Sequence, residues 1–222
     1  MVAPFSSGDL LALRVFPEND FAPYTSVWHC SPEGDWSIYN DGPSLETTCP
    51  RWWGKALTHA SLNNIEVTWI GPNTLRVEME NPRLEWTMAL KAPLFLRILN
   101  AINAALPRWT WKPAPLLRIR EWISNRLLGM GRIHFWLVTP NGQQATIMPE
   151  EVFFFETSKA IWDGRDLGKP IRLSTNPTIG DVPLPTLPTF IIGQAYGRIT
   201  DMEEDQKTRQ EMGYDKNTNN FD

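Results

Sequence analysis

IEVTWIGPNTLRVEMENPRLEWTMAL (residues 65–90) is the stretch that decides the fold of this chain. Its apolar residues alternate with polar ones, and the turn sequences GPN (71–73) and NP (81–82) divide it into three segments. Alternation with a period of two is typical of strands that bury one face. The stretch therefore predicts a three-stranded antiparallel meander in which Trp86 and Met88 share one face.

Shorter segments of the same kind lie on both sides of the meander. Each is an apolar run bounded by Gly, Pro, Asn or Asp, which indicates a short strand next to a turn. They are residues 10–16, 26–30, 35–40, 132–140, 144–148, 150–157, 160–164 and 189–200. About ten strands in antiparallel succession favour a barrel with room for one small ligand. We expect one mainly β domain over residues 1–200, an extended Pro-rich loop at 169–189, and a polar tail at 201–222.

Residues 93–130 (PLFLRILNAINAALPRWTWKPAPLLRIREWISNRLLGM) interrupt the strands and predict two helices, 94–106 and 116–128. Apolar residues recur at helical spacing in both, while Arg97, Asn100 and Asn103 lie on another face of the first helix. The apolar stripes are Leu94, Ile98 and Ile102, and Ile119, Trp122 and Ile123. We expect these stripes to cover the barrel as a lid, with the arginines facing water or holding an anionic group of a ligand.

The helical insert also carries an unusual charge. Eight of the 21 Lys and Arg residues, but one of the 25 Asp and Glu residues, lie between Lys91 and Arg132, which leaves 13 basic and 24 acidic residues elsewhere. The net charge of −4 argues against a general nucleic-acid-binding protein, which needs a basic face to neutralise phosphates. Cationic helices that contain Trp also suit a lipid interface, so contact with a membrane surface remains an alternative.

Motifs of the common catalytic and cofactor sites are missing from the sequence. There is no G-x-S-x-G, no Walker A or dinucleotide-binding glycine loop, and no metal-binding spacing among His29, His59 and His134. We therefore expect neither a metal nor a cofactor. Cys30 and Cys49 could form a disulfide or remain free thiols. The first residues lack the pattern of a secretory signal, so we expect a cytoplasmic protein.

Two side chains are candidates for proton transfer. His134 follows the helical insert and shares a strand face with Trp136, and a neutral imidazole inside an apolar barrel could act as an acid or a base. Glu85 alternates with the apolar residues of its strand, and burial would raise its pKa if its face lined the interior. For both residues the alternative is a solvent-facing position, because an error of one residue in register exchanges the two faces.

Eleven Trp residues favour an aromatic ligand site, since the indole ring combines a large apolar area with one N–H donor. The segment TTCPRWWGKAL (47–57) could be an aromatic loop at the mouth of the barrel, or an ordinary packed loop. The candidate substrate-binding residues are Arg51, Trp52, Trp53, Trp69, Trp86, Met88, Trp122 and Trp136.

The abundant Trp and the segments NPRLEWTMAL (81–90) and TPNGQQATIMPEEVFFFETSKAIWDGRDLG (139–168) resemble lipocalin-like β-barrels. The resemblance is to proteins related to carotenoid hydratases and to cofactor-free pericyclic cyclases of natural-product pathways. It implies an antiparallel lipocalin-like barrel, here with an inserted helical pair, and a hydrophobic ligand such as a polyketide or terpenoid intermediate. We expect a cyclase or isomerase that works by orienting its substrate and excluding water. A non-catalytic carrier and a peripheral membrane protein are the alternatives.

Overall fold

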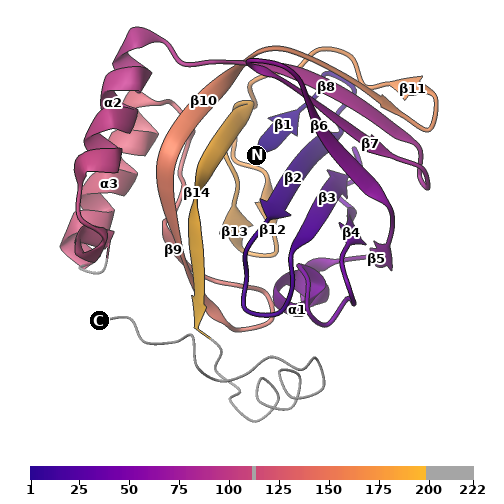
Figure 1. Cartoon of the computed structure of the whole chain (residues 1–222), viewed down its shortest axis with the longest axis horizontal. Coiled ribbons are helices and arrows are strands. Elements are labelled where there is room, and N and C mark those ends of the chain that lie inside the picture. The colour runs from indigo at the N-terminus through magenta and orange to yellow at the C-terminus, as the bar shows by residue number, and fades with distance from the viewer. Residues whose placement is uncertain (112–113, 199–222) are drawn as a thin grey trace.

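The computed structural model describes residues 1–111 and 114–198, so the expected tail at 201–222 lies outside the described residues. The protein is mainly β, with α2 and α3 side by side on one side of a curled sheet and α1 near β4 and β5 (Figure 1). The strands are β1 (Val2–Pro4), β2 (Leu10–Phe16), β3 (Tyr24–Cys30), β4 (Trp36–Asp41), β5 (His59–Leu62), β6 (Ile65–Gly71), β7 (Thr74–Met79), β8 (Leu84–Lys91), β9 (Trp136–Val138), β10 (Gln144–Trp162), β11 (Arg165–Asp166), β12 (Thr178–Ile179), β13 (Val182–Pro183) and β14 (Thr189–Arg198). The helices are α1 (Pro50–Trp53), α2 (Leu94–Ala105) and α3 (Ala114–Leu127), with 3₁₀ turns η1 (Gly54–Ala56) and η2 (Arg108–Trp111).

The sheet forms a half-barrel in which the strands follow the order β5-β4-β3-β2-β1-β14-β10-β8-β7-β6, with β9 and β11 paired to β10. Its two edges, β5 and β6, are joined by Asn63 and Asn64, and near this link the Ile65 N–H donates to Asp41 Oδ2 over 3.1 Å. β4 and β5 run parallel, so the sheet is mixed. The structure therefore confirms a mainly β protein with a curled sheet. The sheet differs from the expected antiparallel lipocalin-like barrel because it is open and mixed.

The β6–β8 meander forms where the sequence predicts it. β6 pairs with β7 and β7 with β8, both antiparallel. Alternate residues of β8, among them Trp86 and Met88, are fully buried in the interior of the half-barrel, and Leu11 and Val27 meet them from β2 and β3. The alternation of residue types thus places the meander's apolar face inside, as predicted.

β10 is a single strand of 19 residues, where the sequence predicts three separate segments from 144 to 164. It pairs with β14 along the residues on both sides of Pro149, and the register shifts by a bulge between Pro149 and Glu151. The proline therefore interrupts the ladder without ending the strand, because a bulge accommodates one extra residue. On the preceding side the expected strand 132–140 is shorter, and only β9 forms.

A second core covers the outer face of β1–β4. Trp28 and Ile38 on that face pack beneath α1 and beneath the loop that contains β12 and β13. The Trp36 Nε1–H donates to the carbonyl oxygen of Thr178 over 2.8 Å, which fixes the loop to the sheet. The Pro-rich segment 169–189 is thus an extended loop that lies over the domain, as expected. Both cysteines are free, and Cys49 is buried.

The helical pair packs on β10 and β14 through a third core, to which Leu96, Trp111 and Leu128 contribute. Apart from Ile123, which lines a small space against the sheet, the predicted stripe residues do not form this contact: Leu94 is 72% exposed and Trp122 is 60% exposed. The expectation that the stripes cover the barrel as a lid is therefore wrong, because the sheet receives the opposite side of α2.

Asn100 explains why α2 turns this side inward. β8 pairs with β10 only from Phe154 onward, so the neighbouring backbone at Val152 has no strand on that edge. Asn100 Nδ2 donates to the Val152 carbonyl oxygen and Asn100 Oδ1 accepts the Val152 N–H, both over 3.0 Å. The side chain thereby replaces a strand at a buried position, where unpaired backbone groups are costly.

Among the described residues no helix is long and apolar enough to cross a membrane.

Candidate functional site

Trp86 and Met88, two predicted substrate-binding residues, lie in the interior of the half-barrel. Both are fully buried, and the Trp86 Nε1–H donates to Ser158 Oγ over 2.9 Å. Phe5 and Phe155 pack against the Trp86 ring at centroid distances of 6.4 and 6.3 Å. These side chains fill the interior, so they are core residues and do not form the wall of a ligand pocket that the sequence suggests.

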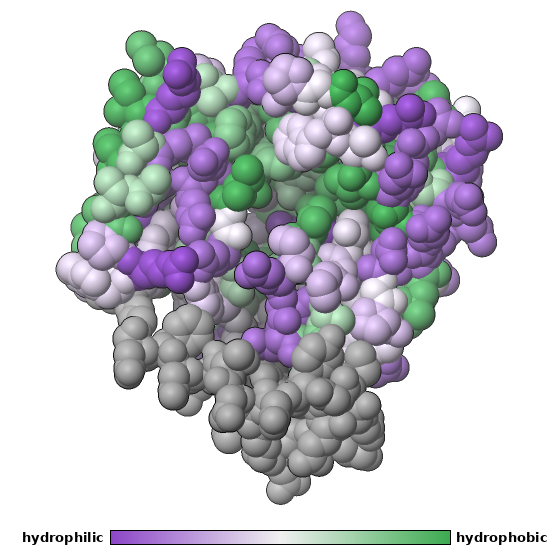
Figure 2. Space-filling model, viewed as in Figure 1, coloured by the Kyte–Doolittle hydropathy of each residue, from purple (hydrophilic) through white to green (hydrophobic). Residues whose placement is uncertain are grey.

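Trp69 lies at the open side of the half-barrel and is 53% exposed. Its ring meets Phe190 of β14 edge to face at 6.1 Å, and Phe190 meets Phe153 of β10 at the same distance. We call Trp69, Phe153 and Phe190 the open-side aromatic cluster. Figure 2 shows a hollow at the middle of the face viewed, bordered by both hydrophobic and hydrophilic side chains. The cluster joins three strands, and Phe153 and Phe190 pack against the interior core.

The sequence predicts one member of this cluster, Trp69, as a site residue, but not the other two. Phe153 and Phe190 belong to strands that the sequence predicts, but it does not show that β14 and β10 curve round to meet the edge strand β6. That meeting depends on the order of strands in the sheet. The run VFFF (152–155) is the one local sign of an aromatic strand there.

The loop residues Arg51, Trp52 and Trp53 form α1 and pack at the outer face of the sheet. The Trp53 ring lies 5.1 Å from that of Trp28, and the Arg51 guanidinium lies 5.0 Å above the ring of Phe21. The β9–β10 turn is tied to this loop, since Asn141 Nδ2 donates to the Arg51 carbonyl oxygen over 2.8 Å. This is the packed loop that was the alternative to an aromatic barrel mouth.

His134 and Trp136 share a face, as the alternation predicts, but the face is the outer one. Both side chains are exposed, while Ile133, Phe135 and Leu137, which alternate with them, are buried. His134 Nδ1 lies 3.5 Å from Glu121 Oε2 of α3, and Glu121 Oε1 accepts the Phe135 N–H over 2.9 Å. His134 therefore helps to join α3 to the sheet and does not face the interior.

Glu85 lies on the outer face of the meander. It pairs with Arg83, whose Nη2 is 2.6 Å from Glu85 Oε1. It is also opposite Glu78 in the strand register, and Glu78 is opposite Glu66. Carboxylates and Arg83 line a surface depression here, but the described residues hold no group of side chains suited to a metal ion. Glu85 thus faces solvent, which was the alternative to a buried catalytic position.

A buried polar cluster that the sequence does not predict lies between the β1–β2 turn, β3 and β11. Asp9 accepts hydrogen bonds from His29 Nε2 over 2.7 Å and from both terminal nitrogens of Arg165 over 2.8 Å. Burial alone would raise the pKa of Asp9, but the hydrogen bonds from Arg165, His29 and Ser7 lower it well below its usual value. The carboxylate is therefore ionised at neutral pH.

The same cluster includes an aromatic support. The imidazole of His29 stacks on Trp162 at 4.2 Å, and Tyr39 lies 5.6 Å from Trp162. Since Arg165 occupies both oxygens of Asp9, the arrangement is a clamp that ties three elements together. No local motif could reveal it, because the partners of Asp9 are far away in the sequence.

A small cavity of about 50 Å³ lies between α2, α3 and the sheet. Arg120 lines it, with its guanidinium 3.7 Å above the ring of Trp111 and its Nη2 2.8 Å from Thr110 Oγ1. Burial lowers the pKa of Arg120. A space of this size holds a few water molecules at most, so it is too small for an organic ligand.

The predicted site residues are thus distributed over the interior core, the outer faces of the sheet, α1 and the outward side of α3. The open-side aromatic cluster is the place where partly exposed rings from different strands converge. Comparisons with family models, with curated proteins and with solved structures find no match to this chain.

Proposed function

We propose that this protein binds a hydrophobic small molecule at the open side of its half-barrel. The observation that supports the proposal is the open-side aromatic cluster, in which the half-exposed Trp69 packs against Phe190 and Phe190 packs against Phe153. An apolar ligand would cover these rings, and burial of apolar surface contributes about 25 cal/mol per Å². Because the interior behind the cluster is filled by side chains such as Trp86, we expect the ligand to lie across the opening.

Binding, rather than catalysis, is the function that the geometry supports best. His134 and Glu85 both lie on outer faces, away from the aromatic cluster, so neither is placed to move a proton on a ligand there. The protein could still catalyse cyclisation or isomerisation of the bound ligand without a cofactor, since such reactions depend on shape and exclusion of water. The test below therefore also looks for conversion of the ligand. The proposed location is the cytoplasm.

The test is a titration of the purified protein with retinol, a hydrophobic isoprenoid whose fluorescence reports binding. We expect binding to the wild type, and Trp69→Ala to weaken it by about tenfold, which is about 1.4 kcal/mol. Trp122→Ala and Trp136→Ala are matched controls, because both rings are about as exposed as Trp69 but lie elsewhere on the surface. Chromatography of the recovered retinol would reveal conversion and would then favour an enzyme over a carrier.

Absence of binding by the wild type would overturn the proposal. Equal affinity of the wild type and Trp69→Ala would place the ligand away from the aromatic cluster and would also overturn it. Weaker binding by Trp122→Ala with Trp69→Ala unchanged would move the site to the helices.

A further inference from the structure

The side of the helical pair that faces away from the sheet is largely apolar. On α2, Leu96 and Asn100 contact the sheet, whereas Ile98 and Ile102 lie on the opposite side and are about half exposed. Trp109 of η2 is 62% exposed. A surface helix normally presents a polar side to water, so the apolar outward side of α2 departs from the usual arrangement.

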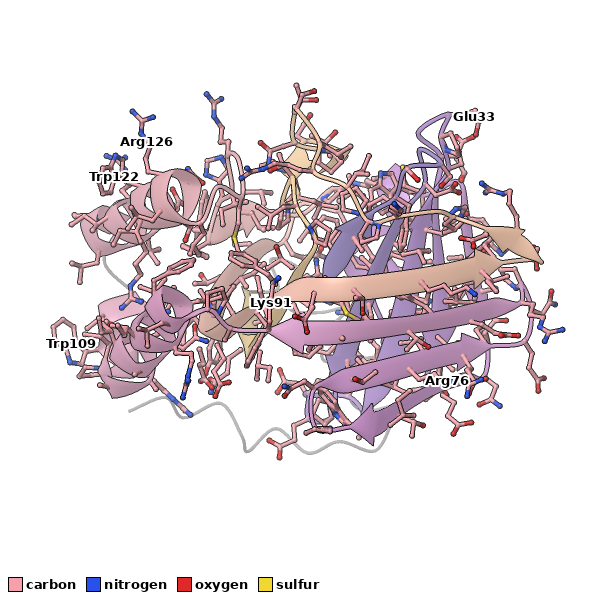
Figure 3. All side chains as sticks on the ribbon, turned by 90° about the horizontal axis from the view of Figure 1, so that it is seen from above. Glu33, Arg76, Lys91, Trp109, Trp122 and Arg126 are labelled. Atoms are coloured by element: carbon pink, nitrogen blue, oxygen red, sulfur yellow. The ribbon has the colours of Figure 1, made fainter. Side chains whose placement is uncertain are left out.

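The outward side of α3 continues this surface. Ile119 and Trp122 are more than half exposed, while Leu117 on the other side of the helix and Leu128, just after its end, are buried. Figure 3 shows Trp109 and Trp122 at the end of the molecule farthest from the meander residue Arg76. An apolar patch that spans two helices and a turn marks an interaction surface rather than scattered exposed residues.

Arginines are interleaved with these apolar side chains. Arg118, Trp122 and Arg126 are spaced by four residues and are all exposed on α3, and Arg97 and Arg108 are exposed on α2 and η2. The one acid between residues 91 and 132, Glu121, is turned toward the sheet, where it accepts the Phe135 N–H and faces His134. We call Leu94, Ile98, Ile102, Trp109, Ile119 and Trp122, with Arg97, Arg108, Arg118 and Arg126, the helical face.

The charge of the helical face selects among possible partners. A second copy of this chain would bring the same arginines against each other with no exposed acid among the described residues of the insert to pair with them, so self-association is disfavoured. Nucleic acid would neutralise the arginines but leave the apolar side chains uncovered. An anionic lipid surface satisfies both, because its phosphates pair with arginine and its acyl region receives Ile and Trp.

The rest of the molecule reinforces this choice. Outside residues 91–132 the chain has 13 basic and 24 acidic residues, so its body is repelled by an anionic surface while the helical face is attracted. The opposite signs therefore orient the protein with α2 and α3 toward the lipid.

We propose that the helical face docks on the surface of an anionic lipid bilayer, with α2 and α3 lying along the interface and Trp109 and Trp122 at headgroup level. Neither helix crosses the bilayer. This proposal is independent of the proposed ligand site, since it uses none of the open-side aromatic cluster.

The test is co-sedimentation of the purified protein with vesicles. One set contains phosphatidylcholine alone, and a second contains about one third phosphatidylglycerol, which supplies a negative surface potential. We expect binding to the anionic vesicles and at least about tenfold weaker binding to the neutral ones. In about 1 M salt, where the Debye length is about 3 Å, binding to anionic vesicles should fall toward the neutral level.

Two variants separate the apolar and ionic contributions. Ile98→Ser with Trp122→Ser should abolish binding, and Arg118→Gln with Arg126→Gln should weaken binding to anionic vesicles while leaving binding to neutral ones unchanged. The matched controls are Trp136→Ser, an exposed Trp on β9, and Arg76→Gln on the meander; both should bind as the wild type does. All of these positions are surface-exposed or half-exposed, and circular dichroism verifies that each variant is folded.

Each contrary result overturns the proposal. Failure of the wild type to sediment with either vesicle, or equal binding to both, excludes an anionic lipid partner. A concentration-dependent dimer that is lost in Ile98→Ser/Trp122→Ser, with no vesicle binding, identifies the helical face as a self-association surface. Loss of vesicle binding in Trp69→Ala, rather than in the helical variants, would assign membrane contact to the ligand site.

Discussion

The β6–β8 meander and the α2–α3 pair both carry apolar residues at regular spacing, yet the meander buries them and the helices expose them. Trp86 and Val77 of the meander are fully buried, whereas Leu94 and Trp122 of the helices are mostly exposed. The meander folds over a concave interior, where its apolar side packs against residues of β1, β2 and β3. The helices have only the outer face of β10 and β14 to pack on, and they meet it with Leu96 and Asn100. A periodic pattern thus identifies an apolar face but does not identify what covers it.

The largest effect is expected from a comparison of one Trp from each region. Trp86→Ala removes a fully buried ring and its hydrogen bond to Ser158, so we expect the free energy of unfolding to fall by about 3–5 kcal/mol. Trp122→Ala should change it by no more than about 0.5 kcal/mol, as is usual for surface positions. Urea denaturation followed by circular dichroism measures both. Similar losses in the two variants would mean that Trp122 is packed as core and that the helical face is not free.

The second test concerns the attachment of the helices to the sheet. Asn100→Ala leaves the buried N–H and carbonyl oxygen of Val152 without partners, so we expect a loss of about 2–4 kcal/mol and faster amide hydrogen exchange in α2. Asn103→Ala is the control on the same helix, because Asn103 accepts one long hydrogen bond, from Arg120 Nη1 at 3.4 Å. Equal exchange in wild type and Asn100→Ala would show that packing alone holds the helices.

The smallest effect is expected at the polar clamp, and it depends on pH. Asp9→Asn keeps the shape but removes the charge that Arg165 and His29 contact, and we expect a loss of about 2 kcal/mol at neutral pH, moderated because Arg165 is half exposed. The folded-state pKa of Asp9 is below its unfolded value of about 3.9, so its stabilisation is present above that pH and is lost as the pH falls toward the folded value. Urea denaturation of both proteins at several pH values should show the difference narrowing below about pH 4. A difference that is constant down to low pH would contradict an ionised, clamped Asp9.

The sequence predicts much of the local structure for physical reasons that are themselves local. Alternation is enough to give β6, β7 and β8 with their correct buried faces, and helical spacing with Pro107 and Gly129 gives two helices close to α2 and α3. At Pro149 the local signal predicts the end of a strand, but the strand continues through a bulge that the sequence does not predict.

What the sequence does not predict depends on contacts between distant segments. Asn100 has the polar character of a solvent-facing residue, and its burial follows from a gap between β8 and β10 that exists only in the assembled sheet. Asp9, His29 and Arg165 carry no common motif, and Phe190 meets Trp69 only because the sheet curls. The candidate site is therefore a property of strand order, which single-sequence patterns do not determine.

β1 lies between β2 and β14 in the sheet, with Val2 opposite Thr189, so strands from the two extremes of the described chain pair at its centre. During synthesis β2 to β5 can assemble beside β1 early, but the other side of β1 stays an open backbone edge until nearly all the described residues have left the ribosome. An open edge of this kind can pair with strands of other chains. Contacts between distant segments also slow folding. The sheet thus stays unfinished until β14, the last of the described strands to be made, joins its two halves.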